Sequence, residues 1–158
     1  SHMSTHCTYV SILFIRLSIS FWRASISIFT LLLISCHTSV TKEDLKKLNG
    51  YWEIKQVTLS DGNTKDYKVN ETIDFFEIKN SNGFRQKVMP QFDGKFKTNG
   101  FKETINIVEK DRDFFIEYTT KYGKWKEEIL TIEDSTLVLK NKENLKYTYK
   151  KFKPFTFK

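Results

Sequence analysis

The chain has few of the residues that most often carry out chemistry. Only two of its 158 residues are cysteine, Cys7 and Cys36, and its three histidines are at positions 2, 6 and 37. The long part that follows residue 37 therefore has no disulfide, no thiol nucleophile and no soft metal ligand. Nucleophile–base pairs and transition-metal sites lose their usual residues there. We expect a protein that is not an enzyme and that uses no metal and no cofactor.

Carboxylates are present, but none forms a convincing acid–base pair. Asp111 and Asp113 flank Arg112 in a sequence that is typical of a turn. Glu127 and Glu128 are adjacent in a strand pattern, so their side chains are expected on opposite faces of a sheet. Neither pair is positioned to act on one bond, which again favours a binding function over catalysis.

Acidic residues are absent from the first part of the chain. Residues 8–34 contain no Asp or Glu, and their only charged residues are Arg16 and Arg23. The apolar stretch ends in Leu33-Ile34-Ser35-Cys36, which resembles the bacterial lipobox. This resemblance implies cleavage before Cys36 and attachment of a diacylglycerol to its thiol, with the two arginines as the positive flank.

An uncleaved transmembrane anchor is the alternative for this segment. A span needs about 20 apolar residues, and the interior arginines and many serines weaken it. We predict that residues 1–35 are a cloning remnant (Ser1–Met3) plus a lipoprotein signal peptide, and that residues 36–47 are a lipid-anchored tether. This places the protein in the bacterial cell envelope, as an outer-membrane lipoprotein on the periplasmic or surface face.

A short N-terminal helix is expected near residue 44. Thr41 is a suitable N-cap, and Glu43 and Asp44 suit the first turn. Beyond it, the expected barrel domain covers residues 48–153, and residues 154–158 form a C-terminal tail that begins with Pro154. Residues 36–158 contain 24 of the 26 basic residues and all 19 acidic ones, a net charge of +5. The lysines alternate with apolar residues and point to solvent, so no nucleic-acid partner is predicted.

From residue 50 onward the hydrophobic pattern has a period of two. Turn residues such as Ser60-Asp61-Gly62-Asn63 interrupt it at short, regular intervals. Short connections demand antiparallel neighbours, and eight strands are enough to close a barrel. The predicted fold is all-β, an eight-stranded antiparallel up-and-down barrel, with strands at Tyr51–Leu59, Thr72–Lys79, Phe84–Met89, Lys102–Glu109, Phe114–Thr120, Trp125–Ile132, Thr136–Lys140 and Leu145–Phe152.

The sequence Leu48-Asn49-Gly50-Tyr51-Trp52 at the start of the first strand resembles the Gly-x-Trp motif of lipocalins, particularly the short lipocalin-like lipoproteins of Bacteroidetes. The resemblance implies that Gly50 allows a tight entry and that Trp52 plugs the closed end of the barrel. It also implies a basic side chain from the last strand across the tryptophan, for which Lys146, Lys150 and Lys151 are available. The second lipocalin motif and the cysteine pair are missing, and avidin-like barrels share the same opening.

Alternation along the strands predicts which side chains face the barrel interior. The expected inward residues are Trp52, Ile54, Ile73, Phe75, Ile105, Ile107, Phe114, Ile116, Tyr118, Ile129, Leu137, Leu139, Tyr147 and Tyr149. The pairs Phe75-Phe76 and Phe114-Phe115 put an aromatic ring on each face, so the register could slip by one residue.

The resemblance implies that the barrel binds a small apolar or amphipathic molecule, although such a barrel can also be filled by its own side chains. The candidate ligand contacts are Phe75, Ile107, Phe114, Ile116, Tyr118, Ile129, Leu139, Tyr147 and Tyr149.

A protein–protein interaction module is the rival hypothesis. The irregular stretch Pro90–Gly100, with a short extra strand expected at Lys95–Thr98, borders the open end of the predicted barrel. Phe92, Phe96 and the adjacent Phe101 would form an exposed aromatic patch of the kind that marks a partner surface.

Overall fold

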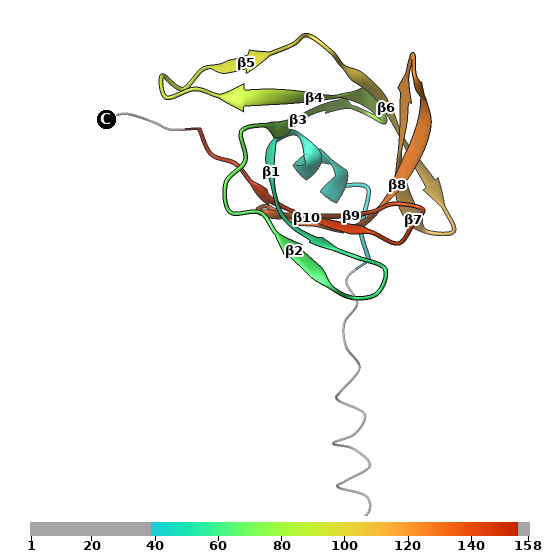
Figure 1. The fold of residues 1–158 in the computed structure, drawn as a ribbon. Coiled ribbons are helices and arrows are strands. Elements are labelled where there is room, and N and C mark those ends of the chain that lie inside the picture. Colours follow the sequence, from blue (N-terminus) through green and yellow to red (C-terminus); the bar gives the residue numbers. More distant parts are fainter. Residues whose placement is uncertain (1–38, 155–158) are drawn as a thin grey trace, which may run out of the picture. The chain divides into compact units, whose positions relative to one another are not determined.

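Ten strands and one short helix make up the part of the computed structural model that can be described, residues 39–154 (Figure 1). The predicted signal segment, Cys36 and the end of the tail lie outside these residues. The elements are the 3-10 helix η1 (Asp44–Leu48) and the strands β1 (Gly50–Thr58), β2 (Thr64–Asp66), β3 (Ile73–Lys79), β4 (Asn82–Pro90), β5 (Phe96–Thr98), β6 (Glu103–Lys110), β7 (Asp113–Thr120), β8 (Gly123–Ile132), β9 (Thr136–Lys140) and β10 (Lys146–Lys151).

Eight of the strands form a closed ring. The pairing order is β1-β3-β4-β6-β7-β8-β9-β10, and β10 pairs with β1, so each main strand lies antiparallel to its neighbours. The two remaining strands are extensions, because β2 pairs only with β1 and β5 only with β4. This confirms the predicted eight-stranded up-and-down barrel, including the extra strand between residues 95 and 98.

Tight turns explain why the strands follow one another around the ring. Lys110 pairs with Asp113, and the two residues between them, Asp111 and Arg112, have positive φ angles of 54° and 71°. This is the backbone of a two-residue hairpin turn whose twist matches that of the flanking strands. The acidic residues around Arg112 therefore belong to a turn, as the sequence predicts.

The half of the barrel interior that is nearer η1, the lower half, is filled with apolar side chains. Thirteen buried residues form one cluster in the described chain, and several of them have no exposed surface at all. Burial of each such side chain contributes roughly 1.5–3 kcal/mol to folding, so this cluster is the main source of stability. Its members are Leu48, Trp52, Phe76, Ile105, Ile107, Phe114, Ile116, Tyr118, Ile129, Ile132, Leu137, Leu139 and Tyr149.

One end of the barrel is closed by η1 together with Trp52, and Figure 1 shows the helix inside the ring of strands. The Trp52 indole Nε1 donates a hydrogen bond to the Leu48 carbonyl at 2.7 Å. The Lys151 ammonium lies 4.2 Å from the centroid of the Trp52 ring and donates hydrogen bonds to the carbonyls of Lys47, at 2.8 Å, and Asn49. Lys151 is thus the basic residue that the lipocalin resemblance requires of the last strand.

The short helix begins close to where the sequence predicts it. Thr41 and Asp44 exchange hydrogen bonds, with Thr41 Oγ1 donating to the Asp44 carboxylate at 2.6 Å and Thr41 Oγ1 accepting from the Asp44 backbone N–H at 3.3 Å. The helix itself starts at Asp44, and its N-cap is Glu43 rather than Thr41. No helix within residues 39–154 is long and apolar enough to cross a membrane.

The register of β3 differs from the prediction by one residue. Phe76 is fully buried in the interior, whereas Phe75 lies on the outer face, with its ring 4.7 Å from that of Tyr51. Tyr51 in turn stacks on Phe96 of β5 at 4.1 Å. The prediction that Phe75 faces inward was wrong because β5 covers the outer face here and makes it as apolar as the inner face. The prediction that Ile73 faces inward was wrong for the same reason, because Ile73 is buried on the same outer face.

We expect the Lys151→Met substitution to lower the free energy of unfolding by about 1–3 kcal/mol, because two carbonyl groups lose their hydrogen-bond donor. Lys150→Met is the matched control, since Lys150 is exposed on the outer face of the same strand. The control should change stability by less than about 0.5 kcal/mol. Urea unfolding of both variants makes the measurement, and equal losses would show that Lys151 does not hold the closed end.

Candidate ligand site at the barrel mouth

The end of the barrel opposite η1 contains a cavity of about 660 Å³. It exists because β9 is shorter than β8: their last pair at this end is Glu128 with Lys140, so residues 123–127 of β8 have no partner in β9. The cavity is lined by Glu117, Tyr118, Thr119, Lys124, Trp125, Lys126, Glu127, Asn141, Lys142, Glu143 and Tyr147.

Aromatic rings form the apolar wall of this cavity. Tyr118 of β7 and Trp125 of β8 are direct cross-strand partners, and their rings stack at 5.1 Å with an interplanar angle of 11°. Tyr118 is fully buried, whereas Trp125 is 37% exposed at the mouth. Tyr147 of β10 is held by Asn141, whose side-chain amide donates to the tyrosine hydroxyl at 3.3 Å. Aromatic walls with a few fixed polar groups are typical of small-molecule sites.

Buried charges lie beside the aromatic wall. Glu127 points into the barrel from β8, and its side chain is 9% exposed. Its Oε2 lies 3.7 Å from Nη1 of Arg85 on β4. The Arg85 guanidinium also pairs with Glu103 and lies over the ring of Tyr118, 4.3 Å from the ring centroid. The four side chains come from four consecutive strands of the ring and converge on its interior.

A second charged pair lies one step closer to the open end. Asp74 and Lys87 are cross-strand partners on the inward face of β3 and β4, and Lys87 Nζ lies 2.7 and 2.9 Å from the two carboxylate oxygens. The Asp74 side chain is 2% exposed and that of Lys87 is 58% exposed, so the lysine reaches from solvent into the mouth. Charged groups inside a barrel cost stability relative to apolar ones, which makes the cluster a candidate for function.

Burial controls the protonation of this cluster. Burial raises the pKa of Glu127, an effect that outweighs the opposing influence of the Arg85 guanidinium. Burial also raises the pKa of Tyr118 and Tyr149 well above the usual value, so both phenols stay protonated. Within the described residues, Glu127 Oε2 accepts no hydrogen bond although it is fully shielded from solvent.

The structure distributes the predicted ligand contacts over several places. Tyr118 and Tyr147 line the mouth cavity. Phe75 lies on the outer face, as described above. The others belong to the filled core: Ile107 and Phe114 toward the closed end, and Ile116, Ile129, Leu139 and Tyr149 higher in the barrel. Their role as ligand contacts stays a prediction.

Neither Trp125 nor the charged residues of the site were predicted from the sequence. Asp74, Arg85, Glu103 and Glu127 occupy inward positions where only apolar residues were expected. One signal was available: Arg85 is one of only two arginines after residue 36, and it lies in a strand pattern, whereas Arg112 lies in a turn. Arginine suits buried ion pairs better than lysine does, so an arginine in a lysine-rich strand indicates such a pair.

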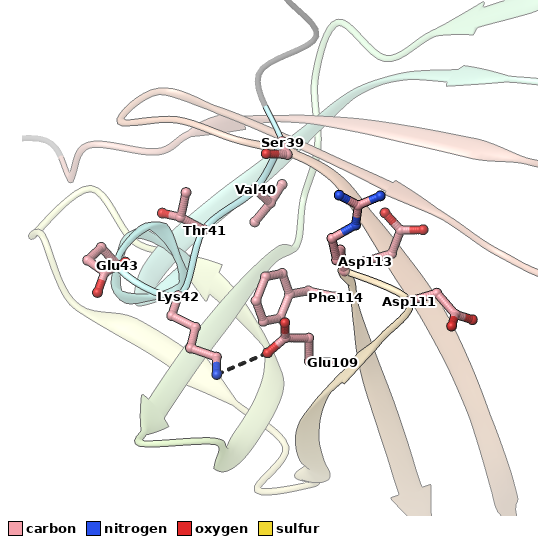
Figure 2. Close-up of a pocket in the computed structure, with 10 residues that line it drawn as sticks. Ser39, Val40, Thr41, Lys42, Glu43, Glu109, Asp111, Asp113 and Phe114 are labelled. Carbon is pink, nitrogen blue, oxygen red and sulfur yellow. Dashed lines mark ion pairs between the residues drawn. The ribbon is translucent and has the colours of Figure 1, made fainter.

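A second cavity, of about 490 Å³, lies at the closed end (Figure 2). Residues 39–43 form one wall, and the turn between β6 and β7 forms the other. Figure 2 shows the ion pair that bridges them, Lys42 Nζ to Glu109 Oε2 at 3.0 Å. Their side chains are 72% and 42% exposed, so the pair is a surface contact that contributes little to stability. This cavity has no buried charged group and is a weaker candidate than the mouth.

No group of three His, Cys, Asp or Glu side chains among residues 39–154 is arranged to hold a metal ion. The acidic residues of the mouth are instead separated by Arg85 and Lys87, which neutralise two of them. The arrangement therefore suits recognition of an organic molecule through aromatic contacts and one or two polar groups.

An eight-stranded up-and-down barrel with a tryptophan plug and a basic side chain across it defines a lipocalin-like fold. No family model matches the sequence, and no curated protein matches it. Among solved structures, the chain is similar to a lipocalin-like protein from Bacteroides uniformis, with 18% identity and a TM-score of 0.43 over 67% of this chain and 99% of that one.

Two further solved structures are similar to the chain. An uncharacterized protein from Bacteroides eggerthii has 14% identity and a TM-score of 0.42, over 66% of this chain and 99% of that one. Lobster apocrustacyanin A1 has 10% identity and a TM-score of 0.39, over 75% of this chain and 74% of that one.

The raised pKa of Glu127 predicts a dependence of stability on pH. The folded state holds the proton of Glu127 more tightly than the unfolded state does. The stability that this protonation contributes is therefore fully present below the ordinary pKa of 4.5, and it is lost as the pH rises through the raised pKa. Glu127→Gln is neutral at every pH and should therefore gain stability relative to the parent as the pH rises from about 4 to about 8.

Urea unfolding across this pH range tests the expectation. Glu128→Gln is the control, because Glu128 lies on the outer face of the same strand with its carboxylate 2.6 Å from Lys140. The control should show no such gain. If the difference in stability between Glu127→Gln and the parent stays constant with pH, the raised pKa of Glu127 is contradicted.

Proposed function

We propose that this protein is a lipid-anchored envelope lipoprotein whose barrel binds a small amphipathic molecule at its mouth. The observation that supports the proposal is the mouth cavity, where Tyr118, Trp125 and Tyr147 stand beside the buried Glu127 and Arg85. The rings offer apolar contact area, and the charged groups can orient a polar end of the ligand. We propose no enzymatic activity.

The filled lower half sets the depth of the proposed site. Ile105, Ile116, Leu137 and Leu139 have no exposed surface, so the space below the charged cluster is occupied by the protein itself. A ligand that enters from the mouth would rest on the cluster and extend between the β7–β8 and β9–β10 hairpins. The proposed ligand is therefore small, and one part of it stays near solvent.

Lipid anchoring would tether the barrel through its closed end. Ser39 lies at the closed end, where it lines the cavity shown in Figure 2. It follows Cys36 by three residues, which span at most roughly 11 Å of extended chain. A lipid on Cys36 would then hold the closed end near the membrane surface, and the mouth would be free to exchange ligand away from it.

An interaction module is the second candidate, and a specific observation favours it. Seven large hydrophobic residues are exposed within residues 39–154: Leu59, Val69, Met89, Phe92, Phe101, Tyr122 and Trp125. The rings of two of them, Phe101 and Tyr122, lie 6.1 Å apart, and adjacent exposed aromatic rings often mark a partner surface. Phe96, which was expected in this patch, is instead packed against Tyr51 and Phe152.

One purification distinguishes the two candidates. We expect the protein, purified from its native membrane, to carry a small molecule that native mass spectrometry detects as a mass increment and that organic solvent extracts. Trp125→Ala, which removes the exposed half of the stacked ring pair, should lower the bound fraction about tenfold. Tyr122→Ala is the control, since Tyr122 is an exposed mouth residue outside the cavity lining. A stoichiometric protein partner without a bound small molecule would favour the interaction module.

Lipidation is tested separately. When the full chain is produced in a bacterium with a lipoprotein pathway, we expect incorporation of labelled fatty acid and loss of residues 1–35. Cys36→Ser should abolish both, while Cys7→Ser should leave both unchanged, because Cys7 lies within the segment that is removed. Labelling that persists in Cys36→Ser would contradict the assigned anchor.

A further inference from the structure

We propose that the mouth cavity recognises a small molecule with a protonated amine, which pairs with Glu127 while its apolar part lies against Trp125 and Tyr147. The inference rests on the proposed function and names the class of ligand. It is drawn from the position of Glu127, from the pairing of the other interior charges and from the aromatic lining.

Glu127 is the charged group of the interior that is built into the cavity wall. It is the next inward residue after Trp125 on β8, and its side chain is 9% exposed. One of its oxygens, Oε2, accepts no hydrogen bond within the described chain, and Arg85 Nη1 lies 3.7 Å away, beyond hydrogen-bond distance. A buried acceptor that is left unsatisfied is destabilising, so a donor supplied by a ligand would be favoured.

The other interior charges already have closer partners. Arg85 Nε is hydrogen-bonded to Glu103, and Arg85 Nη1 lies 3.5 Å from the Tyr118 hydroxyl. Lys87 is hydrogen-bonded to Asp74 at 2.9 Å. Two cations thus pair with two carboxylates. Glu127, the third carboxylate of the cluster, has a hydrogen bond from the neutral Tyr118 hydroxyl and the Arg85 guanidinium at 3.7 Å, but no cation within hydrogen-bond distance. A cationic ligand would neutralise it, whereas an anionic ligand would add a fourth negative charge to the barrel interior.

The aromatic lining suits the same ligand. Trp125 and Tyr147 present rings next to Glu127, and a cation is attracted to the face of such rings. Lys124, Lys126 and Lys142 also line the cavity, together with Glu117 and Glu143. All five are exposed at the rim, where water and salt screen their charges, so the buried carboxylate dominates the selection of charge.

Three probes of one shape test the proposal: 3-phenylpropylamine, 3-phenylpropanol and 3-phenylpropanoate. Calorimetric titration into the full chain at neutral pH should give the tightest binding for the amine, by about tenfold or more over the carboxylate. Glu127→Gln should weaken binding of the amine about tenfold and leave that of the alcohol unchanged. Glu128→Gln, outside the cavity on the same strand, should leave all three unchanged. Circular dichroism confirms that both variants are folded.

The outcomes separate this inference from the proposed function. If the carboxylate binds best, or if Glu127→Gln weakens all three probes equally, the amine proposal is overturned and the mouth site stands. The neutral fluorophore N-phenyl-1-naphthylamine tests whether the mouth binds an apolar molecule at all, whatever the charge preference of the site. If neither the fluorophore nor any of the three probes binds, both the amine proposal and the mouth site are overturned.

Discussion

The contact between the last strand and the first turn holds the rest of the structure in place. Lys151 reaches across the Trp52 ring to the carbonyls of Lys47 and Asn49. It thereby joins β10 to η1 and β1, which are separated by about a hundred residues. A barrel without free edges needs its first and last strands to pair, and this contact reinforces that junction. The lysine offers the carbonyls a charged donor at the point where the helix ends.

The turns and alternation could be read from the sequence because both depend on local chemistry. The polar residues Lys110 to Asp113 between two apolar strand patterns indicate a turn, and a period of two fixes which residues share a face. The register of β3 could not be read in this way. Phe75 and Phe76 are equally apolar, and the choice between them is made by Tyr51 and Phe96, which lie far away in the sequence and bury Phe75 from outside.

The site was predicted only in two of its aromatic residues, and Trp125, the third, was not expected to face inward. Tyr118 and Tyr147 were expected to face inward because they continue an apolar face. Alternation from Ile129, which was expected to face inward, places Glu127 on the same face, but alternation alone does not show that this glutamate is buried beside an arginine. What reveals Glu127 is the pairing of β7 with β8, which places it opposite Ile116, and the curvature of the ring, which brings it within 3.7 Å of Arg85 on β4, three strands away. That relation is a property of the closed ring and exists in no single strand.

The division of the barrel into two halves connects stability with binding. The lower half gains stability from complete burial of apolar side chains, and its packing leaves no room for a ligand. The upper half is less stabilising. Asp74, Arg85 and Glu127 lose the favourable free energy of hydration when they are buried, and their ion pairs recover only part of it. A purely structural barrel would fill this space with leucine or isoleucine at no such cost. The shortened β9 exposes this costly half to the mouth, where a ligand can supply the missing partner.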